Sequence, residues 1–455
     1  MKAIMSVFNF LMAAGPTVML PVIITVIGLI FGLKITRAFK SGLTLGIGFA
    51  GIKLILDFMT TNVGPAAKAM VERTGVQLDA LDVGWGSIAA VTWASPIIPL
   101  LVFAILIVNI ILLILKRTNT LDVDIWNYHH MAIVGVMVYF VTKNVLLGVG
   151  ASVIMAIITF KISDWSQPMV EGFFGIPGVS LPTVSALSSL VIAWPLNWLL
   201  DRIPLFRKSS FTIKDAQKYL GFFGDSMIMG LVIGLVIGLL AGFDVTQVFQ
   251  LGVSMSAVLV LIPKMTSLFM EGLMPISDAA QKWSQAKFKG RRLFIGLDAA
   301  VVVGNPDVIT TALIIIPLTI AMALVLPGNR VLPFADLAVV PFRVAMVVAL
   351  TRGNLLKNIV IGLVVTASLL WCGTATAPVL TAIAKSVGIE LGANAMLISS
   401  FAATAMIQSY LVFLAFTFKP LIGIPILLIV FAGAWYYFEG VKKINVENMK
   451  EAPSN

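Results

Sequence analysis

The chain has 455 residues, of which 59% are hydrophobic and only 11% are charged, and its formal net charge is +10. A mean hydropathy of +1.03 excludes an ordinary soluble protein, because a chain of this size cannot bury so much apolar surface in water. The basic residues fall in short segments between apolar runs, which is typical of a membrane-orientation signal rather than of a nucleic-acid surface. We therefore expect an all-α polytopic membrane protein, embedded in the lipid bilayer and without a nucleic-acid partner.

The single cysteine, Cys372, excludes an internal disulfide and a cysteine-based metal cage. It lies between Trp371 and Gly373 with no basic neighbour to lower its pKa, so we expect a small core residue and not a phosphoacceptor. The two histidines are adjacent, and the sequence predicts neither a metal site nor a cofactor. The first apolar runs are longer than about 20 residues and lack a small-residue cleavage site, so we expect no signal peptide.

In the first half of the chain, apolar runs predict spans over 14–32 and 43–59, separated by a basic loop over 34–40. An external segment over 60–81 and a polar, broken stretch over 82–99 (DVGWGSIAAVTWASPIIP) follow, leading into a span that ends at Leu115. Two short spans are expected over 130–141 and 145–160. The stretch 172–200 is rich in Gly, Pro and Ser, which predicts a re-entrant hairpin.

In the second half, a basic linker over 202–218 precedes GLVIGLVIGLLAG, whose glycines at four-residue intervals predict a helix face that a neighbour approaches closely. Further spans are expected over 252–269, 308–326, 337–350 and 359–371. A second mixed segment over 372–418 predicts another hairpin, before a last span over 421–438 and a polar tail.

The stretch 294–318 (FIGLDAAVVVGNPDVITTALIIIPL) places polar residues between long apolar runs. Hydrocarbon cannot satisfy such groups, and the dipeptide Asn305-Pro306 predicts the end of one element and the start of a helix near Asp307. A helix broken at membrane depth with polar groups at the break is typical of a transporter's binding site. The alternative is a short extramembrane loop between two spans.

Ordered matches between the two halves predict an internal duplication. GLKITRAFKSG at Gly32 matches GFDVTQVFQLG at Gly242 with a shift of 210 residues, and VTKNVLL matches LTRGNLL with a shift of 209. We expect a first repeat over 1–201, a linker over 202–221, a second repeat over 222–419, and a last span with its tail over 420–455. Five spans per repeat would invert the second copy relative to the first, and one more span gives about eleven, with two hairpins.

The charges predict an orientation with the N-terminus outside and the C-terminus in the cytoplasm. In that arrangement 21 of the 31 Lys and Arg residues fall in inner loops and seven fall in outer segments, while Lys53, Lys264 and Arg343 lie within spans.

A set of motifs in order, among them GPTVMLP, GIGFAGI, GPAAKAM, DVGW, VDIWN, GLLAGFDV, AKFKG, FIGLDAA and PGNRVLPFADLA, resembles the galactitol-type membrane subunit, enzyme IIC, of the bacterial sugar phosphotransferase system. The resemblance covers residues 14–365 and is weaker from 370 to 443. It implies a homodimer of eleven-span protomers with inverted repeats in the bacterial inner membrane, where a scaffold part carries the dimer contact and a core part moves the substrate as an elevator.

The resemblance also implies the activity and the partners. Such a subunit takes up a polyol or sugar, and a separate B subunit with a phosphocysteine, supplied by an A subunit, phosphorylates it on the cytoplasmic side. Nothing in this chain resembles an A or B domain, because it has no hydrophilic stretch of the ~100 residues that a soluble domain needs. We expect a transport subunit without a catalytic nucleophile of its own.

A polyol site needs carboxylates, amides, hydroxyls or imidazole within a mostly apolar cavity. Asp298 and Asn305 are the first candidates, each with helix capping as the alternative, and Asp82 occupies the related place in the first repeat. His130 follows VDIWN, where ascorbate-type relatives carry a histidine, although its neighbour His129 can equally face inward. The other candidates lie in the two hairpins and in PFADLA: Thr183, Ser185, Asp336 and Gln408.

Two rival functions remain at this point. An ion-coupled secondary transporter would use Asp57, Glu271 or Asp298 as its coupling carboxylate. An integral-membrane enzyme is disfavoured because the sequence shows no nucleophile–base pair.

Overall fold

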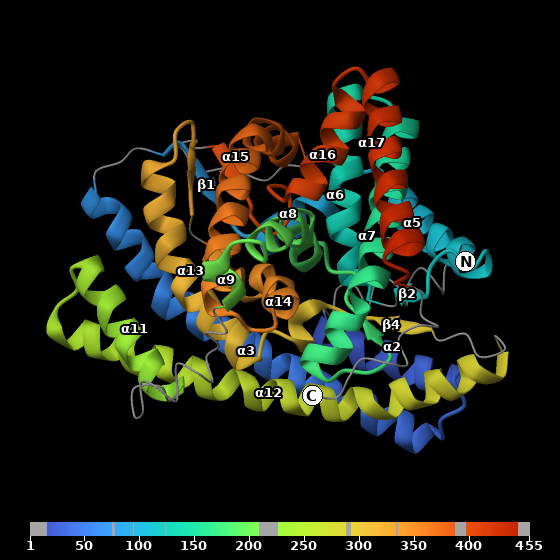
Figure 1. Ribbon diagram of the computed structural model, residues 1–455, viewed down its shortest axis with the longest axis horizontal. Coiled ribbons are helices and arrows are strands. Elements are labelled where there is room, and N and C mark those ends of the chain that lie inside the picture. Colours follow the sequence, from blue (N-terminus) through green and yellow to red (C-terminus); the bar gives the residue numbers. More distant parts are fainter. Residues whose placement is uncertain are drawn as a thin grey trace.

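The computed structural model describes residues 16–74, 78–93, 95–122, 124–208, 226–287, 293–333, 335–386 and 397–444. Most of these residues are helical, as expected for an all-α membrane protein (Figure 1). The expected tail and much of the 202–221 linker lie outside the described residues.

Four helices form one layer along the lower edge of Figure 1. They are α2 (Pro16–Ile30), α3 (Ile35–Thr74), α11 (Ser226–Ala241) and α12 (Val245–Lys287). Helix α2 packs on α3, α11 packs on α12, and α3 packs on α12. The turns between the paired helices use Gly32 and Gly242, whose φ angles of 86° and 71° favour glycine. A glycine is also required where α11 meets α12, because a Cβ on Gly234 would lie 2.6 Å from the Cα of Gly252.

The length of these helices corrects two expectations. The basic loop expected over 34–40 and the external segment expected over 60–81 both belong largely to α3, a single helix of 40 residues. At 1.5 Å per residue this helix is about 60 Å long, twice the thickness of a bilayer's hydrocarbon. Pro65 lies inside this helix without ending it.

The remaining helices form a second body above this layer. In the first half these are α4 (Trp85–Trp93), α5 (Ile98–Ile114), α6 (Ile125–Thr142), α7 (Val145–Phe174), α8 (Val184–Leu200) and α9 (Pro204–Lys208). In the second half they are α13 (Pro306–Val325), α14 (Val340–Thr351), α15 (Leu355–Ser386), α16 (Ile407–Thr417) and α17 (Pro420–Trp435), with the 3₁₀ helices η2 (Ala299–Val301) and η3 (Ala335–Val339) before α13 and α14. Helix α8 packs on α14 and α15, and α16 packs on α6 and α17.

Two small parallel sheets, which the sequence did not predict, exchange strands between the halves of the chain. Strand β1 (Ala80–Asp82) pairs with β5 (Val331–Leu332) and β6 (Leu397–Ser399) from the second half. Strand β4 (Phe294–Gly296) pairs with β2 (Thr120–Asp122) and β3 (Val179–Ser180) from the first half. Parallel partners are joined by long connections, so the paired strands lie far apart in the sequence. Runs of only two or three residues are also too short to show the alternating pattern of a strand.

Four described helices are long and apolar enough to cross a bilayer: Val145–Phe174, Pro306–Val325, Leu355–Ser386 and Pro420–Val441. Shorter apolar helices are α5, α8, α14 and α16, together with 230–241 of α11. The count of eleven spans stays a prediction. The span expected to end at Trp371 continues to Ser386, because Cys372-Gly373 does not stop α15, and Cys372 is buried as expected.

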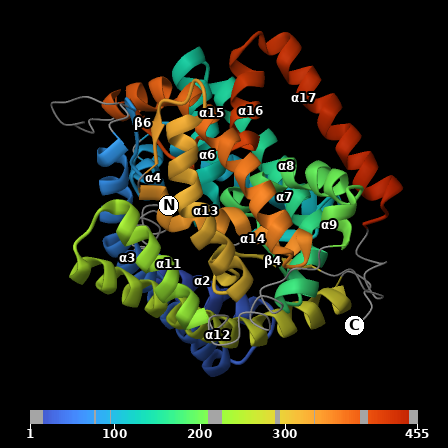
Figure 2. The ribbon, with the colours of Figure 1, turned by 60° about the vertical axis from the view of Figure 1, so that its left-hand side comes forward.

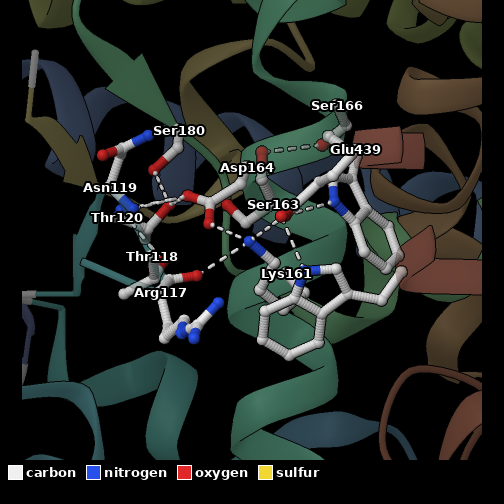
Figure 3. Close-up of polar contacts among 12 residues, drawn as sticks. Arg117, Thr118, Asn119, Thr120, Lys161, Ser163, Asp164, Ser166, Ser180 and Glu439 are labelled. Carbon is white, nitrogen blue, oxygen red and sulfur yellow. Dashed lines mark hydrogen bonds and ion pairs between the residues drawn. The ribbon is translucent and has the colours of Figure 1, made fainter. Parts of the chain in front are cut away.

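The last helix lies at the periphery in Figure 2 and none of its residues is buried. It is fastened to α7 through Glu439 in the π-helical turn η4 (Tyr436–Val441), which accepts hydrogen bonds from the indoles of Trp165 and Trp435 and pairs with Lys161. Figure 3 shows Lys161 at the centre of this group, where its ammonium also donates to the Arg117 carbonyl at 2.8 Å. Lys161 follows directly after the span expected over 145–160, but α7 continues to Phe174 and the residue is buried inside it.

Asp164, one turn beyond Lys161, connects this group to the β2 strand. Its carboxylate accepts the backbone N–H groups of Asn119 and Thr120, each at 3.1 Å, and the Thr120 hydroxyl at 2.9 Å (Figure 3). The side chains that anchor α17 thus also fix the start of β2, which ends at Asp122.

Candidate functional site

Carboxylates gather at the carboxyl ends of the two central strands. Asp82 ends β1 and faces Ser399 of β6 in the register, while Asp122 ends β2 and faces Gly296 of β4. Asp298 follows β4 by two residues. Because parallel strands bring their carboxyl ends to one edge, each sheet presents one polar edge, and we name these the β1 edge and the β4 edge.

At the β4 edge, Thr183 joins the two halves of the chain. Its hydroxyl donates to Asn127 Oδ1 at 2.9 Å and accepts the backbone N–H of Ala299 at 2.8 Å. Asp298 Oδ2 lies 3.4 Å from the same hydroxyl, and its Oδ1 accepts the N–H of Ala300 at 2.7 Å. Asp298 therefore caps η2, as the alternative interpretation proposed, and also holds an oxygen against Thr183.

Two further aspartates of the DVDIWN motif complete this edge. Asp124 Oδ2 accepts the backbone N–H of Asp298 at 3.2 Å, and Asp122 Oδ1 accepts the Asn127 amide at 3.1 Å. Both carboxylates are buried. Such acceptor-rich, donor-poor surroundings match a ligand that brings hydroxyl donors.

At the β1 edge, Asp82 and Asp336 each accept hydrogen bonds from the other half of the chain. Asp82 Oδ2 accepts the N–H of Asp336 at 2.8 Å, and Asp336 Oδ1 accepts the N–H of Trp85 at 2.8 Å. The other oxygen of Asp336 accepts the Ser400 hydroxyl at 2.6 Å and the N–H of Ala402 at 2.9 Å. This carboxylate is fully buried and organises the loop before α16.

The histidines lie between the two edges. Both are buried at the start of α6, directly after Asn127 and Tyr128, and their ring centroids are 3.8 Å apart. The ring of His129 lies 5.9 Å from that of Trp85, whose backbone belongs to the β1 edge. The first turn of α6 therefore contributes to both edges.

A small cavity lies beside the β1 edge. It is lined by Asp336, Arg343, Phe401 and three serines of α8, Ser185, Ser188 and Ser189. Its volume of about 20 Å³ is room for one water molecule. A larger cavity of about 1020 Å³ lies beside α17, but its walls are mostly apolar, so the smaller one has the chemistry of a polyol site.

Of the eight candidates, only Ser185 and Asp336 line this cavity. The Gln408 amide donates to Thr159 at 2.8 Å, and the residue lines the larger cavity. Asn305 is the N-cap of α13, where its Oδ1 accepts the N–H groups of Asp307 and Val308. This helix starts at Pro306, as the Asn-Pro signal predicted, and a substrate role for Asn305 stays a prediction.

The sequence did not single out Asp122, Asp124, Asn127 or Arg343. The first three lie in or next to VDIWN, where polar residues between apolar spans were the available signal. Arg343 lies in an apolar span, where a basic residue is costly in hydrocarbon and therefore points to a function.

Comparisons with known proteins identify the family. The sequence profile of the family described as "PTS system sugar-specific permease component" (EIIC-GAT) matches residues 9–395. The chain belongs to this family. It is 38% identical over 382 residues to the "PTS system galactitol-specific EIIC component" of Escherichia coli strain K12, which covers 84% of this chain and 85% of the relative. It is 36% identical over 399 residues to a "Putative permease IIC component" of the same strain, which covers 88% and 91%. As a sugar-specific permease component of this phosphotransferase family, the protein is a multi-pass membrane subunit that works with separate components of the system.

Proposed function

We propose that this permease component binds a neutral polyol, with galactitol as the first candidate, and moves it across the bacterial inner membrane. The observation that carries the proposal is the pair of polar edges, where buried carboxylate and amide oxygens gather and accept hydrogen bonds from the protein. A carboxylate has about four lone-pair sites, so it can accept a ligand hydroxyl as well. The relatives named above for galactitol support the same substrate class. A neutral ligand is favoured because further negative charge beside several carboxylates would be repelled.

The residues proposed to contact the polyol lie around both edges. Asp298 and Thr183 would bind it at the β4 edge, and Asp82, Asp336 and Ser185 at the β1 edge. His130 or His129 would supply an imidazole between them, while Asn305 and Gln408 are outer candidates. Charge-assisted hydrogen bonds from hydroxyls to the carboxylates would supply most of the binding energy.

The architecture that we propose is an inverted duplication of five spans, with an eleventh span at α17. The exchange of one strand from each half into the other half's sheet supports a two-fold relation. Matching burial supports it as well, because residues 210 positions apart are buried in both halves: Ile24 and Gly234, Phe31 and Ala241, Ala38 and Val248, Leu45 and Met255.

Movement follows from this architecture as an expectation. The layer of α2, α3, α11 and α12 would be the scaffold of a homodimer, and the body that carries both sheets would move past it as an elevator. With the N-terminus outside and the C-terminus in the cytoplasm, a separate B subunit would phosphorylate the substrate from the inner side through its phosphocysteine, supplied by an A subunit.

Uptake by membrane vesicles tests the function. Vesicles that contain the protein should accumulate labelled galactitol only when phosphoenolpyruvate and the soluble carriers with the A and B subunits are present, and the product should be its phosphate ester. Removing the phosphoacceptor cysteine of the B subunit should stop accumulation. Unmodified polyol accumulated under a proton gradient alone would instead establish an ion-coupled transporter.

A further inference from the structure

Arg343 has a buried guanidinium without a hydrogen-bond partner. The residue is 7% exposed, and none of its three side-chain nitrogens has a partner among the residues that the structure describes. Burying a cation that makes no hydrogen bonds destabilises the folded protein, because nothing replaces the hydration that the cation loses. Contacts within the folded chain therefore do not explain why an arginine occupies this position.

The position of Arg343 within α14 adds to this cost. It is the fourth residue of the helix, and the positive end of a helix dipole lies at the N-terminus. The carboxylates of Asp336 and Asp82 act on it electrostatically, and the nearest aromatic ring, that of Phe401, has its centroid 5.7 Å away. These contacts attract the charge but leave its five N–H donors unused.

The guanidinium lines the small cavity together with Asp336 and the α8 serines. Arg343 and Asp336 do not hydrogen-bond to each other directly across this cavity. A hydroxyl placed between them can accept from the guanidinium and donate to the carboxylate at the same time. Ser185 and Ser188 on the facing wall can do either.

We propose that Arg343 is a substrate-contacting residue whose donors are satisfied by hydroxyl oxygens of a neutral polyol that bridges it to Asp336 and the α8 serines. The inference rests on the proposed function and deepens it, because it assigns a cationic donor to a site rich in carboxylate acceptors. It also assigns specificity. The two negative charges of Asp336 and Asp82 outnumber the single positive charge of Arg343, so a sugar acid with the same carbon chain is repelled.

The cavity has room for only one water molecule in this conformation, so a hexitol enters only when its walls separate. The walls belong to α8, η3, α14, α15 and the segment that leads into α16. Movement of α8 and its serines away from Arg343 would open the space without breaking the hydrogen bonds that hold Asp336 to Trp85 and Asp82.

The experiment measures polyol binding and thermal unfolding of purified protein in nanodiscs, for the unmodified chain, Arg343→Met and Arg343→Lys. Galactitol and the hexonic acid of the same configuration are the probes. Arg352→Met, an exposed arginine at the other end of α14, is the matched control. We expect galactitol affinity to fall about tenfold to hundredfold in Arg343→Met and less in Arg343→Lys. Its melting temperature should stay equal or rise, because an unpaired buried cation has been removed.

Three results would overturn the inference. If galactitol binds the unmodified protein and Arg343→Met equally well, the proposed function stands and the role of Arg343 falls. A melting temperature that falls together with affinity in Arg343→Met would make the residue structural. If the unmodified protein binds the hexonic acid and not the polyol, both the inference and the proposed polyol substrate are wrong.

Discussion

The backbone N–H of Asp336 donates to the carboxylate of Asp82 at 2.8 Å, although 254 residues separate them. Asp336 in turn accepts the N–H of Trp85, three residues beyond the end of β1 at Asp82, at 2.8 Å. The two bonds join the halves of the chain at the same edge that lines the candidate site. The proposed binding site and the contact between the two halves therefore share this pair.

Asp82→Ala should lower the stability of the protein, because it leaves the buried N–H of Asp336 without its acceptor. We expect a loss of about 1–3 kcal/mol, seen as a lower melting temperature in detergent. Asp82→Asn keeps an acceptor oxygen and should lose less. Equal melting temperatures for the alanine variant and the unmodified protein would show that the interhalf bond contributes nothing.

Asp298→Asn should weaken polyol binding about tenfold to hundredfold, because it removes the charge from a carboxylate proposed to accept substrate hydroxyls. Insertion into the membrane should stay normal, since asparagine caps a helix about as well as aspartate and can still accept the N–H of Ala300. Direct binding to purified protein is the measurement. Unchanged affinity with intact expression would leave Asp298 as a cap alone.

Lys161→Met should strongly destabilise the packing of α17 on α7. It leaves Asp164, which is buried, without its cation, and it removes the ion pair with Glu439. Breaking a buried pair on one side costs about 3–5 kcal/mol, and thermal unfolding together with protease sensitivity near residue 440 measures the effect. Lys442→Met, at an exposed position in the same region, is the control and should behave like the unmodified protein.

Asn144→Ala and Asn354→Ala should each cost about 1 kcal/mol. The side chain of Asn144 caps α7 by accepting the N–H of Leu147, and that of Asn354 accepts the N–H of Lys357 at the start of α15, both at 3.1 Å. The two positions are 210 residues apart, so similar losses in thermal unfolding would agree with a duplication. Aspartate at either position should restore the cap, and a failure to do so would assign the loss to another cause.

Single cysteines at Asp244 and near Asn455 test the orientation. Asp244 is an exposed turn residue between α11 and α12, and Cys372 is buried, so the background label should be low. In intact cells an impermeant thiol reagent should modify the Asp244 position and spare the C-terminal one. Modification of the C-terminal cysteine from outside would reverse the proposed topology.

The sequence by itself determined the class of protein and the start of one helix, α13. The hydrophobic content required a membrane environment, Asn305-Pro306 placed the start of α13 within one residue, and the glycines at four-residue intervals predicted the close contact of α11 and α12. These are local effects of backbone chemistry and composition, which act wherever the rest of the chain lies. The motifs likewise identified the family.

The tertiary structure alone decided which polar residues meet. Strands of two or three residues are stable only when partners from the other half of the chain pair with them. No local sequence pattern therefore predicted β1 or β4. Their pairing brings Thr183 to Asp298, and Asp82 to Asp336. Folding also places Arg343, an arginine of an apolar helix, in the same cavity as the serines of α8. The burial of a side chain depends on the neighbours that folding supplies and not on its own sequence context.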